Sequence, residues 1–533
     1  TDSYRVVEQT KIEARRMAVS DERYAGALSE SLKELVQSFG NINDGTSLHD
    51  KFTEMMRYLT RLGENPENTV EHEITLKYLS NFLKELNQLA NTCQSLRARA
   101  DSQISYPVMR INNLLQRIKS VNATINKENN NIPALNERDT LLKEISQYMN
   151  IKVRFNNNNT VDIFDGEQRH ILLNSSGVSH LNFNPTATIA PHQTLQGGQL
   201  SGIYLNDDPT QDITEFITSG EIASYFYMRD IQLPNIQEEL DEFAEKLQDV
   251  LNSIGNKGLY IQAPSELKSR YNFSPSDNFT GTGTIRIGLA DNITKQLNSV
   301  QTIDLSTLAT YDDLAFALDA IPGLTAFFDA DDRLTLTATN ASEGIVILPD
   351  TTTPDDYGTV TVSGVDKSFS HSFGFKDLVT SSQQGAGIAN TLKLNADMPA
   401  AFIPTIKASP NAGIGDIVLR VSNVDNLIDL NAGLNGDISF EAAGGFQAQT
   451  TKFPSYITTI YTHNSNALND AESLHDSYEK TLQATEDIIQ SIGGVDLKEA
   501  LTLLNNWLQY LKANTTALAM GNKMIDILLE KVG

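Results

Sequence analysis

The last residues of the chain, 495–532, carry an apolar stripe that repeats in steps of three and four residues. This spacing places the apolar side chains on one face of a helix. A helix of this length extends about 57 Å at ~1.5 Å per residue. The candidate assembly residues along the stripe are Leu497, Leu501, Leu504, Leu508, Leu511, Leu518, Asn522, Ile525, Leu529 and Val532.

The terminal stripe requires a helical partner, because a helix in water gains most of its stability from packing its apolar face. Burying one leucine contributes roughly 1.5–3 kcal/mol. An ordinary internal helix of a bundle is one alternative. The pair Gly493-Gly494 just before the stripe indicates instead a hinge, and predicts a helix that does not fold back tightly. We therefore expect the terminal helix to assemble with a preceding N-terminal segment, a neighbouring subunit, or both.

Helical patterns dominate both ends of the chain. Residues 1–150 are rich in Ala, Leu, Glu, Lys and Arg, and residues 219–257 and 456–492 hold the three-and-four spacing. Ser47 is the expected N-cap of the second helix. Pro234 is expected in a first helical turn, where its missing N–H costs nothing. One seam includes a polar position, and its members are Val108, Ile111, Leu115, Ile118, Asn122 and Ile125.

Two stretches between these helical segments have β patterns. Residues 151–205 begin with alternating apolar and polar residues on both sides of an Asn-rich turn, which predicts a hairpin in a small β insertion. Residues 261–455 are rich in Gly, Thr, Ser, Asp and Asn, which predicts one or two β-rich domains, with a short helix at 311–321. The strand candidates there are 284–289, 333–337, 344–348 and 416–421.

The predicted fold class is a multidomain α+β protein. A long helical coiled-coil trunk is formed by both ends of the chain, and a β-rich outer domain is inserted in the middle. The predicted divisions are 1–260 (helical trunk with a small β insertion at about 151–205), 261–455 (β-rich outer domain or domains), 456–494 (returning trunk helix) and 495–533 (terminal assembly helix).

Charge and cysteine content limit the partners. Lys and Arg number 41 against 67 Asp and Glu, so the net charge is −26. A surface this negative repels nucleic-acid phosphates and anionic lipid, so neither nucleic acid nor membrane is expected as a partner. The one cysteine, Cys93, cannot form an intramolecular disulfide and is expected as a small buried residue on a helix face. The chain is then either cytosolic or exported by a route that does not use disulfides.

No catalytic or cofactor-binding constellation is evident in the sequence. The eight histidines form no HExxH or HxH pair, and neither a GxSxG nor a Walker motif occurs. The acidic run 329–332 resembles the start of a calcium loop. However, Leu334 and Asn340 stand where that loop needs Gly and Glu, so a turn between strands is expected. Trp507 lies at the boundary of the stripe and is expected to pack. We expect no enzyme activity, no metal and no cofactor.

Four sequence blocks have the pattern of one known family. They are 136–142 (NERDTLL) followed by 151–153; 220–258 with Gly220, Arg229-Asp230, Leu233-Pro234, Leu240-Asp241, Ala244, Asn252 and Gly258; 373–378 (FGFKDL); and 494–499 (GVDLKE) with 513–514 and 526–529. These blocks resemble the flagellar hook-associated protein 1 (FlgK) family of hook–filament junction proteins. The resemblance covers 1–260 and 456–533 well and the β-rich middle loosely. Lys376 stands where many members have Asn.

The resemblance implies a structural protein of the bacterial flagellum, secreted unfolded by type III export and located outside the cell at the hook–filament junction. The implied partners are further copies of the chain in an annular homo-oligomer, the hook protein, the second junction protein (hook-associated protein 3), and an export chaperone on the C-terminal helix. The family also has a helix before the point that corresponds to Thr1, so that helix is the expected partner of the terminal stripe.

Three alternatives remain open at the level of sequence. Hook and distal-rod proteins share the terminal motif but form many-layered tubes. A secreted adhesin or carbohydrate-binding module would use residues 261–455. A glycosidase would need a cleft that holds two carboxyl groups in different environments.

Overall fold

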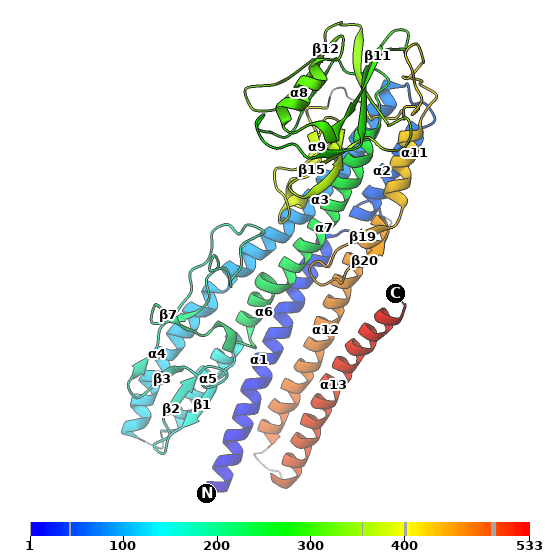
Figure 1. The fold of residues 1–533 in the computed structure, drawn as a ribbon. Helices are drawn as coiled ribbons and strands as arrows, with labels where there is room; N and C mark the ends of the chain where they lie inside the picture. The colour runs from blue at the N-terminus through cyan, green and yellow to red at the C-terminus, as the bar shows by residue number, and fades with distance from the viewer. Residues whose placement is uncertain are drawn as a thin grey trace.

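In the computed structural model, long helices run along most of an elongated molecule, and β-sheets gather at one end and along one side (Figure 1). The structure describes residues 2–41, 44–128, 131–353, 355–398, 402–491 and 497–532, with side chains described between 10 and 489 and from 502 to 523. The N-terminal helix α1 packs lengthwise against α12, so both ends of the chain contribute to one trunk. The predicted α+β class, with β-sheets in the middle of the chain, is confirmed.

Helices supply the length of the molecule. They are α1 (Asp2–Ser38), α2 (Leu48–Leu62), α3 (Thr69–Gln103), α4 (Ser105–Lys127), α5 (Ile132–Tyr148), α6 (Glu221–Tyr227), α7 (Leu233–Lys257), α8 (Tyr311–Asp319), α9 (Phe369–Phe373), α10 (Ile388–Thr391), α11 (Asp425–Asn435), α12 (Phe453–Ser491) and α13 (Leu497–Val532). Single turns of 3-10 helix lie at η1 (Thr214–Phe216) and η3 (Leu305–Thr307), and a π-helical turn at η2 (Met228–Gln232). None of the described helices is long and apolar enough to cross a membrane.

The strands form small, mostly antiparallel sheets. Along the trunk lie β1 (Lys152–Phe155), β2 (Val161–Phe164), β3 (Ile171–Asn174) and β4 (Gly177–Val178), paired in that order, and β5 (Leu181–Asn182), β6 (Tyr204–Leu205) and β7 (Asp208–Asp212), also in order. At the far end the sheets have the orders β11-β10-β14, β12-β13-β8 and β16-β15-β9. Their strands are β8 (Glu266–Lys268), β9 (Gly281–Thr282), β10 (Thr284–Asp291), β11 (Leu297–Asp304), β12 (Leu324–Phe328), β13 (Leu334–Ala338), β14 (Glu343–Leu348), β15 (Thr359–Val362) and β16 (Val365–Ser368). Two ribbons complete the set, β17 (Val379–Thr380) with β18 (Lys393–Leu394) and β19 (Ile438–Phe440) with β20 (Gln449–Thr451).

The upper trunk is held together by aromatic side chains from four helices. The rings of Phe52 (α2) and Phe82 (α3) lie 5.4 Å apart, and those of Phe243 (α7) and Phe453 (α12) 5.3 Å apart, both edge to face. All four side chains are buried in one core cluster. Edge-to-face pairs contribute beyond the apolar area that they bury. Cys93 is buried in the same cluster, as predicted from its place on a helix.

The polar seam predicted in 108–125 packs against a neighbouring helix and a sheet. Helix α4 packs against α5, and its apolar seam residues are buried with residues of β2 and β3. Asn122 donates its amide to the carbonyl oxygen of Val161 (2.8 Å) and accepts the Val161 N–H (3.1 Å). This polar seam residue therefore fixes the position of strand β2 on the helix.

Pro234 lies in the first turn of α7, as predicted, although the helical path starts before it. The helical path begins at Glu221, passes through the π-helical turn 228–232, and continues without a break into α7. The proline follows directly after that wide turn, where the regular i→i−4 ladder is already interrupted. Ser47 is the predicted N-cap, since its hydroxyl oxygen accepts the N–H of Asp50 (3.2 Å).

Most predicted elements of the β-rich end are present. The helix predicted at 311–321 is α8, and the strands predicted at 284–289, 333–337 and 344–348 lie within or overlap β10, β13 and β14. The strand predicted at 416–421 is wrong. Apart from one bridge between Gln296 and Ile417, this stretch is irregular, and its Val418 and Leu419 N–H groups both turn to the carbonyl oxygen of Lys295.

Candidate assembly interface at the terminal helix

The terminal helix α13 runs back along α12 in the opposite direction and lies beside the trunk (Figure 1). It does not pack tightly, however, because Trp507 is 47 % exposed and Leu508 is 52 % exposed. Gly493 and Gly494, the predicted hinge, lie outside the described residues.

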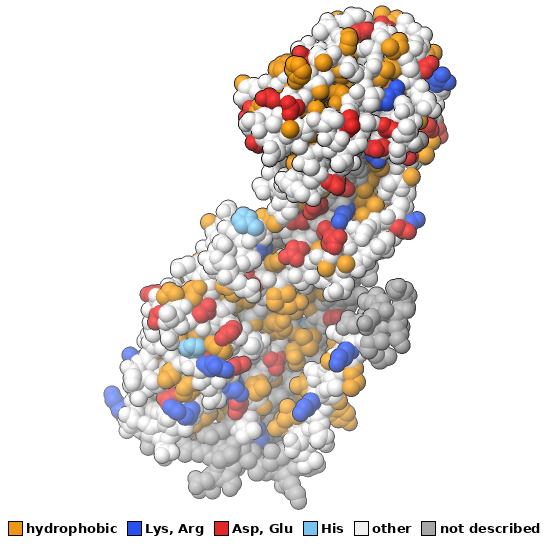
Figure 2. Space-filling view, viewed as in Figure 1, with side chains coloured by type: hydrophobic (Ala, Val, Ile, Leu, Met, Phe, Trp, Pro, Cys, Tyr) orange, Lys and Arg blue, Asp and Glu red, His pale blue; other side chains and the backbone are white. Residues whose placement is uncertain are grey.

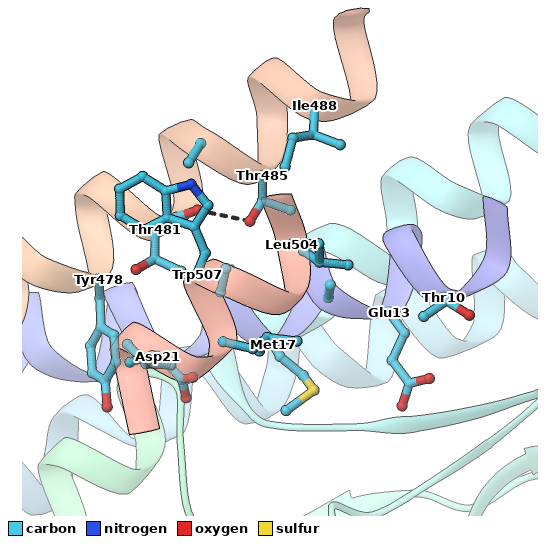
Figure 3. Close-up of a pocket in the computed structure, with 15 residues that line it drawn as sticks. Thr10, Glu13, Met17, Asp21, Tyr478, Thr481, Thr485, Ile488, Leu504 and Trp507 are labelled. Carbon is cyan, nitrogen blue, oxygen red and sulfur yellow. Dashed lines mark hydrogen bonds between the residues drawn. The ribbon is translucent and has the colours of Figure 1, made fainter. Parts of the chain in front are cut away.

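An apolar groove separates α13 from the trunk. Its volume is about 250 Å³, and its walls come from α1, α12 and α13 (Figure 3). Met17 of α1 lies on its floor, Tyr478 and Ile488 of α12 line one side, and Trp507 of α13 covers part of it. A groove this apolar is a surface that another apolar side chain can fill.

The predicted interface residues fall into three groups. Leu504, Leu508 and Leu511 line the groove, so the structure brings them together with the trunk. Leu518 and Asn522 lie further along the helix and are exposed. The side chains of Leu497, Leu501, Ile525, Leu529 and Val532 lie outside the described residues.

Among the described residues, the carboxylates that line the groove are those of Glu13 and Asp21, and both have partners. Glu13 of α1 accepts a hydrogen bond from the ammonium group of Lys152 (3.0 Å). Asp21 of α1 accepts a hydrogen bond from the Ser219 hydroxyl (2.7 Å), and burial raises the pKa of its carboxyl group. Burial also raises the pKa of the Tyr478 hydroxyl. Thr485 satisfies its hydroxyl within α12 by donating to the carbonyl oxygen of Thr481 (2.7 Å). The groove therefore offers packing surface rather than a charged or reactive centre.

Two groove residues were not assigned to the interface from the sequence. Met17 lies on α1, far from the stripe in sequence, and the structure places it, 53 % exposed, in the groove. Trp507 stands beside Leu508 rather than in the stripe itself, so the pattern placed it at the boundary of the stripe. A large aromatic side chain on an otherwise regular apolar helix is the signal that could have included it.

The Arg-Asp pair of the second sequence block fastens the trunk. Arg229 is fully buried, and its guanidinium donates to the carboxylate of Asp101 on α3 (2.6 Å) and to both oxygens of Asp230 (2.8 Å each). Arg97 donates to the Arg229 carbonyl oxygen (2.8 Å) and to that of Gln193. These contacts hold the loop between β5 and β6, residues 183–203, against the trunk.

The second and third sequence blocks meet in space. Asn256 of α7 donates to the Asp377 carboxylate (2.7 Å) and accepts from the Ser370 hydroxyl (2.7 Å). The carboxylate of Asp241, on the same helix, accepts hydrogen bonds from the backbone N–H groups of Gly387 and Ala389 (2.8 Å each). Side chains of α7 thus fix the chain where it returns from the β-rich end. Asp241 and Asn256 therefore have a structural role.

Lys376, the departure from the family pattern, is fully buried at this junction. Its ammonium nitrogen donates to the carbonyl oxygen of Gly258, the C-cap of α7 (2.6 Å). Desolvation lowers the pKa of Lys376 to about 7. Burial raises the pKa of the neighbouring Asp377 to about 6.

Similarity to known proteins agrees with these features. Residues 32–265 match the family model described as "Flagellar hook-associated protein FlgK helical domain". No curated protein sequence matches the chain. The fold is similar to the flagellar hook junction protein FlgK from Burkholderia pseudomallei, with a TM-score of 0.52 over 91% of this chain and 100% of that one, at 13% sequence identity.

The matched segment contains α3 and most of the α7 junction, which hold the Arg229 and Asn256 contacts. The shared fold extends over the trunk and the β-rich end. In the described part of the chain, no group of His, Cys, Asp and Glu could hold a metal ion. Residues 32–265 therefore correspond to the helical domain of flagellar hook-associated protein FlgK, a structural protein of the hook–filament junction, and the chain as a whole has the fold of a flagellar hook junction protein.

Proposed function

We propose that the chain forms one annular layer at the hook–filament junction by self-assembly through its terminal helices. The single observation that carries this proposal is the half-exposed apolar face of α13 above the apolar groove. Leu508, Trp507 and Leu518 are each about half exposed in the free chain. Apolar residues at this density are costly in water and are covered when copies associate.

The proposed arrangement follows the predicted divisions. The trunk of 1–260 and 456–494 carries the outer domain 261–455 away from the assembly axis, and 495–533 lies on the inside. The inner partner of α13 is α13 of neighbouring copies. Side chains of these partners then fill the apolar groove between α13 and the trunk.

Contacts above and below the layer are proposed from the family. The hook protein lies beneath the layer, and hook-associated protein 3 lies above it. Before assembly, an export chaperone covers the same apolar face of α13, because one surface must be shielded during export and used afterwards.

The test is a charge substitution in the groove. Leu504→Asp with Leu511→Asp adds two carboxylates where α13 meets the trunk, whereas Asn505→Asp with Asn506→Asp adds the same charge at exposed positions. The first variant is expected to fold, by far-UV circular dichroism, but to lose self-assembly and motility. The second variant is expected to assemble and swim. Normal swimming by the first variant would overturn the proposal.

A further inference from the structure

The loop between β19 and β20 lies across the middle of α7. The two strands pair from Ile438 with Thr451 to Phe440 with Gln449, and they form the connection from α11 to α12. The loop between them rests on α7 beside the start of α12 (Figure 1). We call residues 441–448 the strap.

Three neighbouring carboxylates of α7 hold the strap by its backbone. Each accepts one backbone N–H group: Glu242 from Glu441 (2.6 Å), Glu238 from Gly444 (3.0 Å) and Glu239 from Gly445 (3.2 Å). The two backbones are in close contact, since a Cβ atom at Gly444 would lie 2.1 Å from the carbonyl oxygen of Asn235. The charge state of the α7 carboxylates therefore affects how firmly the strap is held.

Glu239 is the most buried of these three carboxylates. Its side chain is fully buried, whereas Glu238 is exposed and Glu242 is half-buried. Its second oxygen, Oε2, is buried without a hydrogen-bond partner in the described structure. Burial raises the pKa of the Glu239 carboxyl group, because ionising it in this setting is costly. An ionised Glu239 therefore needs a cation beside it.

His463 of α12 supplies that cation. Its Nδ1 atom lies 3.6 Å from Oε1 of Glu239, and its ring lies 5.3 Å from the ring of Phe446 in the strap. The interaction with the Glu239 carboxylate raises the pKa of His463. The His463 side chain is 44 % exposed, so it can exchange its proton with solvent.

The other titratable groups that face Glu239 from α3 and α12 are neutral. They are the thiol of Cys93 on α3 and the hydroxyl of Tyr456 on α12. Burial raises the pKa of both groups, that of Cys93 to about 12. Neither group can therefore balance the charge of Glu239.

Helix α7 itself is rich in negative charge. It carries six Asp and Glu residues against two Lys, and Figure 2 shows acidic side chains gathered between the β-rich end and the lower trunk, where α7 lies. Glu238 adds a like charge beside Glu239, and Lys246 pairs with Glu242 instead (3.5 Å). Within the described ranges, His463 is therefore the one cation in ion-pair contact with Glu239.

We propose that the strap is a pH-sensitive closure of the trunk, which protonated His463 holds on α7 and which opens when His463 loses its proton. Opening exposes Glu239 and His463 to water, where both groups bind protons less tightly than in the closed state. Closing therefore takes up protons, and the free energy of opening falls as pH rises. Above the titration of His463, an ionised Glu239 stays buried without its cation, which favours the open strap.

Release of the strap loosens the connection through which the chain returns from α11 to the trunk helix α12. Strands β19 and β20 stay paired, because Phe440 is buried and its ring stacks on that of Tyr456 at 4.0 Å. The proposal concerns a single chain, so it does not depend on assembly through α13.

The test is hydrogen–deuterium exchange of the full chain at about pH 6, below the ordinary pKa of His, and at about pH 8.5, well above it. Protection factors are corrected for the pH dependence of intrinsic exchange. Peptides from the strap are expected to lose protection several-fold at the higher pH, because their amides exchange through the open state. The paired amides of β19 and β20 are expected to keep theirs. Unchanged protection of the strap, or an equal loss in the two strands, would overturn the proposal.

Two variants separate the charges from the packing. His463→Gln cannot take up the proton, so its strap is expected to be weakly protected at both pH values. Glu239→Gln removes the buried charge but keeps an acceptor for the Gly445 N–H, so its strap is expected to be well protected at both. A similar loss of protection in the two variants would show that these side chains act by packing alone, and would overturn the proposal.

His475→Gln is the matched control. His475 lies on the same helix, its side chain is 33 % exposed, and its Nε2 atom pairs with Glu22 of α1 (3.3 Å) rather than with α7. This variant is expected to keep the several-fold pH response of the strap. Loss of the response in His475→Gln, or its retention in His463→Gln, would assign the effect to another group and overturn the proposal.

Discussion

The side-chain amide of Asn252, on α7, hydrogen-bonds both the N–H and the carbonyl group of Val379. Its side-chain amide donates to the Val379 carbonyl oxygen (3.0 Å), and its side-chain oxygen accepts the Val379 N–H (3.1 Å). The same oxygen accepts the N–H of Leu378 (2.9 Å). One buried side chain thus satisfies three backbone groups where the chain returns from the β-rich end to the trunk.

Replacing Asn252 by Ala is expected to destabilise this junction by about 3 kcal/mol or more, because each unsatisfied buried backbone group costs ~1–3 kcal/mol. The measurement is the free energy of unfolding in urea. Asn435→Ala is the matched control, since the Asn435 amide donates to a carbonyl oxygen of its own helix while exposed to solvent. Equal losses in both variants would show that Asn252 does not hold the junction.

Removing Arg229 is expected to be among the most damaging single changes in the trunk. Arg229→Met leaves the buried Asp101 carboxylate without its cation, and breaking a buried pair this way typically costs ~3–5 kcal/mol. The measurement is chemical denaturation followed by circular dichroism.

Two further variants separate burial from charge. Arg99→Met breaks the exposed pair between Arg99 of α3 and Glu34 of α1 and is expected to cost at most about 1 kcal/mol. Combining Arg229→Met with Asp101→Leu is expected to recover part of the lost stability, since no uncompensated charge stays buried. No recovery would indicate that the hydrogen bonds to the backbone, rather than the charge pair, carry the effect.

The lowered pKa of Lys376 predicts how the stability of the protein depends on pH. Its pKa is about 7 in the folded chain and near 10.5 when unfolded, so between these values the unfolded chain binds more protons. Stability contributed by this residue is therefore expected to rise from pH 7 to about pH 10.5. Lys376→Met should remove that rise, as measured by urea unfolding across this range.

The stability that Asp377 contributes is expected to change with pH in the opposite direction. The pKa of Asp377 is raised to about 6 from 3.8, so between these values the folded chain binds more protons, and its contribution falls as pH rises. Asp377→Asn should remove this fall and leave the rise above pH 7. A Lys376→Met variant with an unchanged profile above pH 7 would show that the ammonium group is not desolvated in solution.

The sequence predicted local structure well where one periodicity decided the outcome. The helices, the Ser47 cap and the buried Cys93 follow from spacing and residue type alone. The strand predicted at 416–421 failed because its residues turn to the carbonyl oxygen of Lys295, a contact no local pattern contains. The π-helical turn before Pro234 was not predicted, because it leaves no signature in the residue spacing.

For the candidate interface, spacing identified which face of α13 is apolar but not what lies opposite. Met17 on α1 and Tyr478 on α12 reach the same groove from opposite ends of the chain. Their meeting depends on how the whole trunk packs. The assignment of all ten residues to the assembly interface, including the Leu504, Leu508 and Leu511 that line the groove, stays a prediction.

Trp507 offers the most direct measurement of the central claim, because it is the one tryptophan of the chain and lies on α13 above the groove. Acrylamide quenching of its fluorescence compares the free subunit with the assembled junction layer. Coverage of α13 by other copies predicts strong quenching in the free chain, and weak quenching with an emission maximum at shorter wavelength in the layer. Equal quenching and an unchanged emission maximum in both states would contradict assembly through this helix.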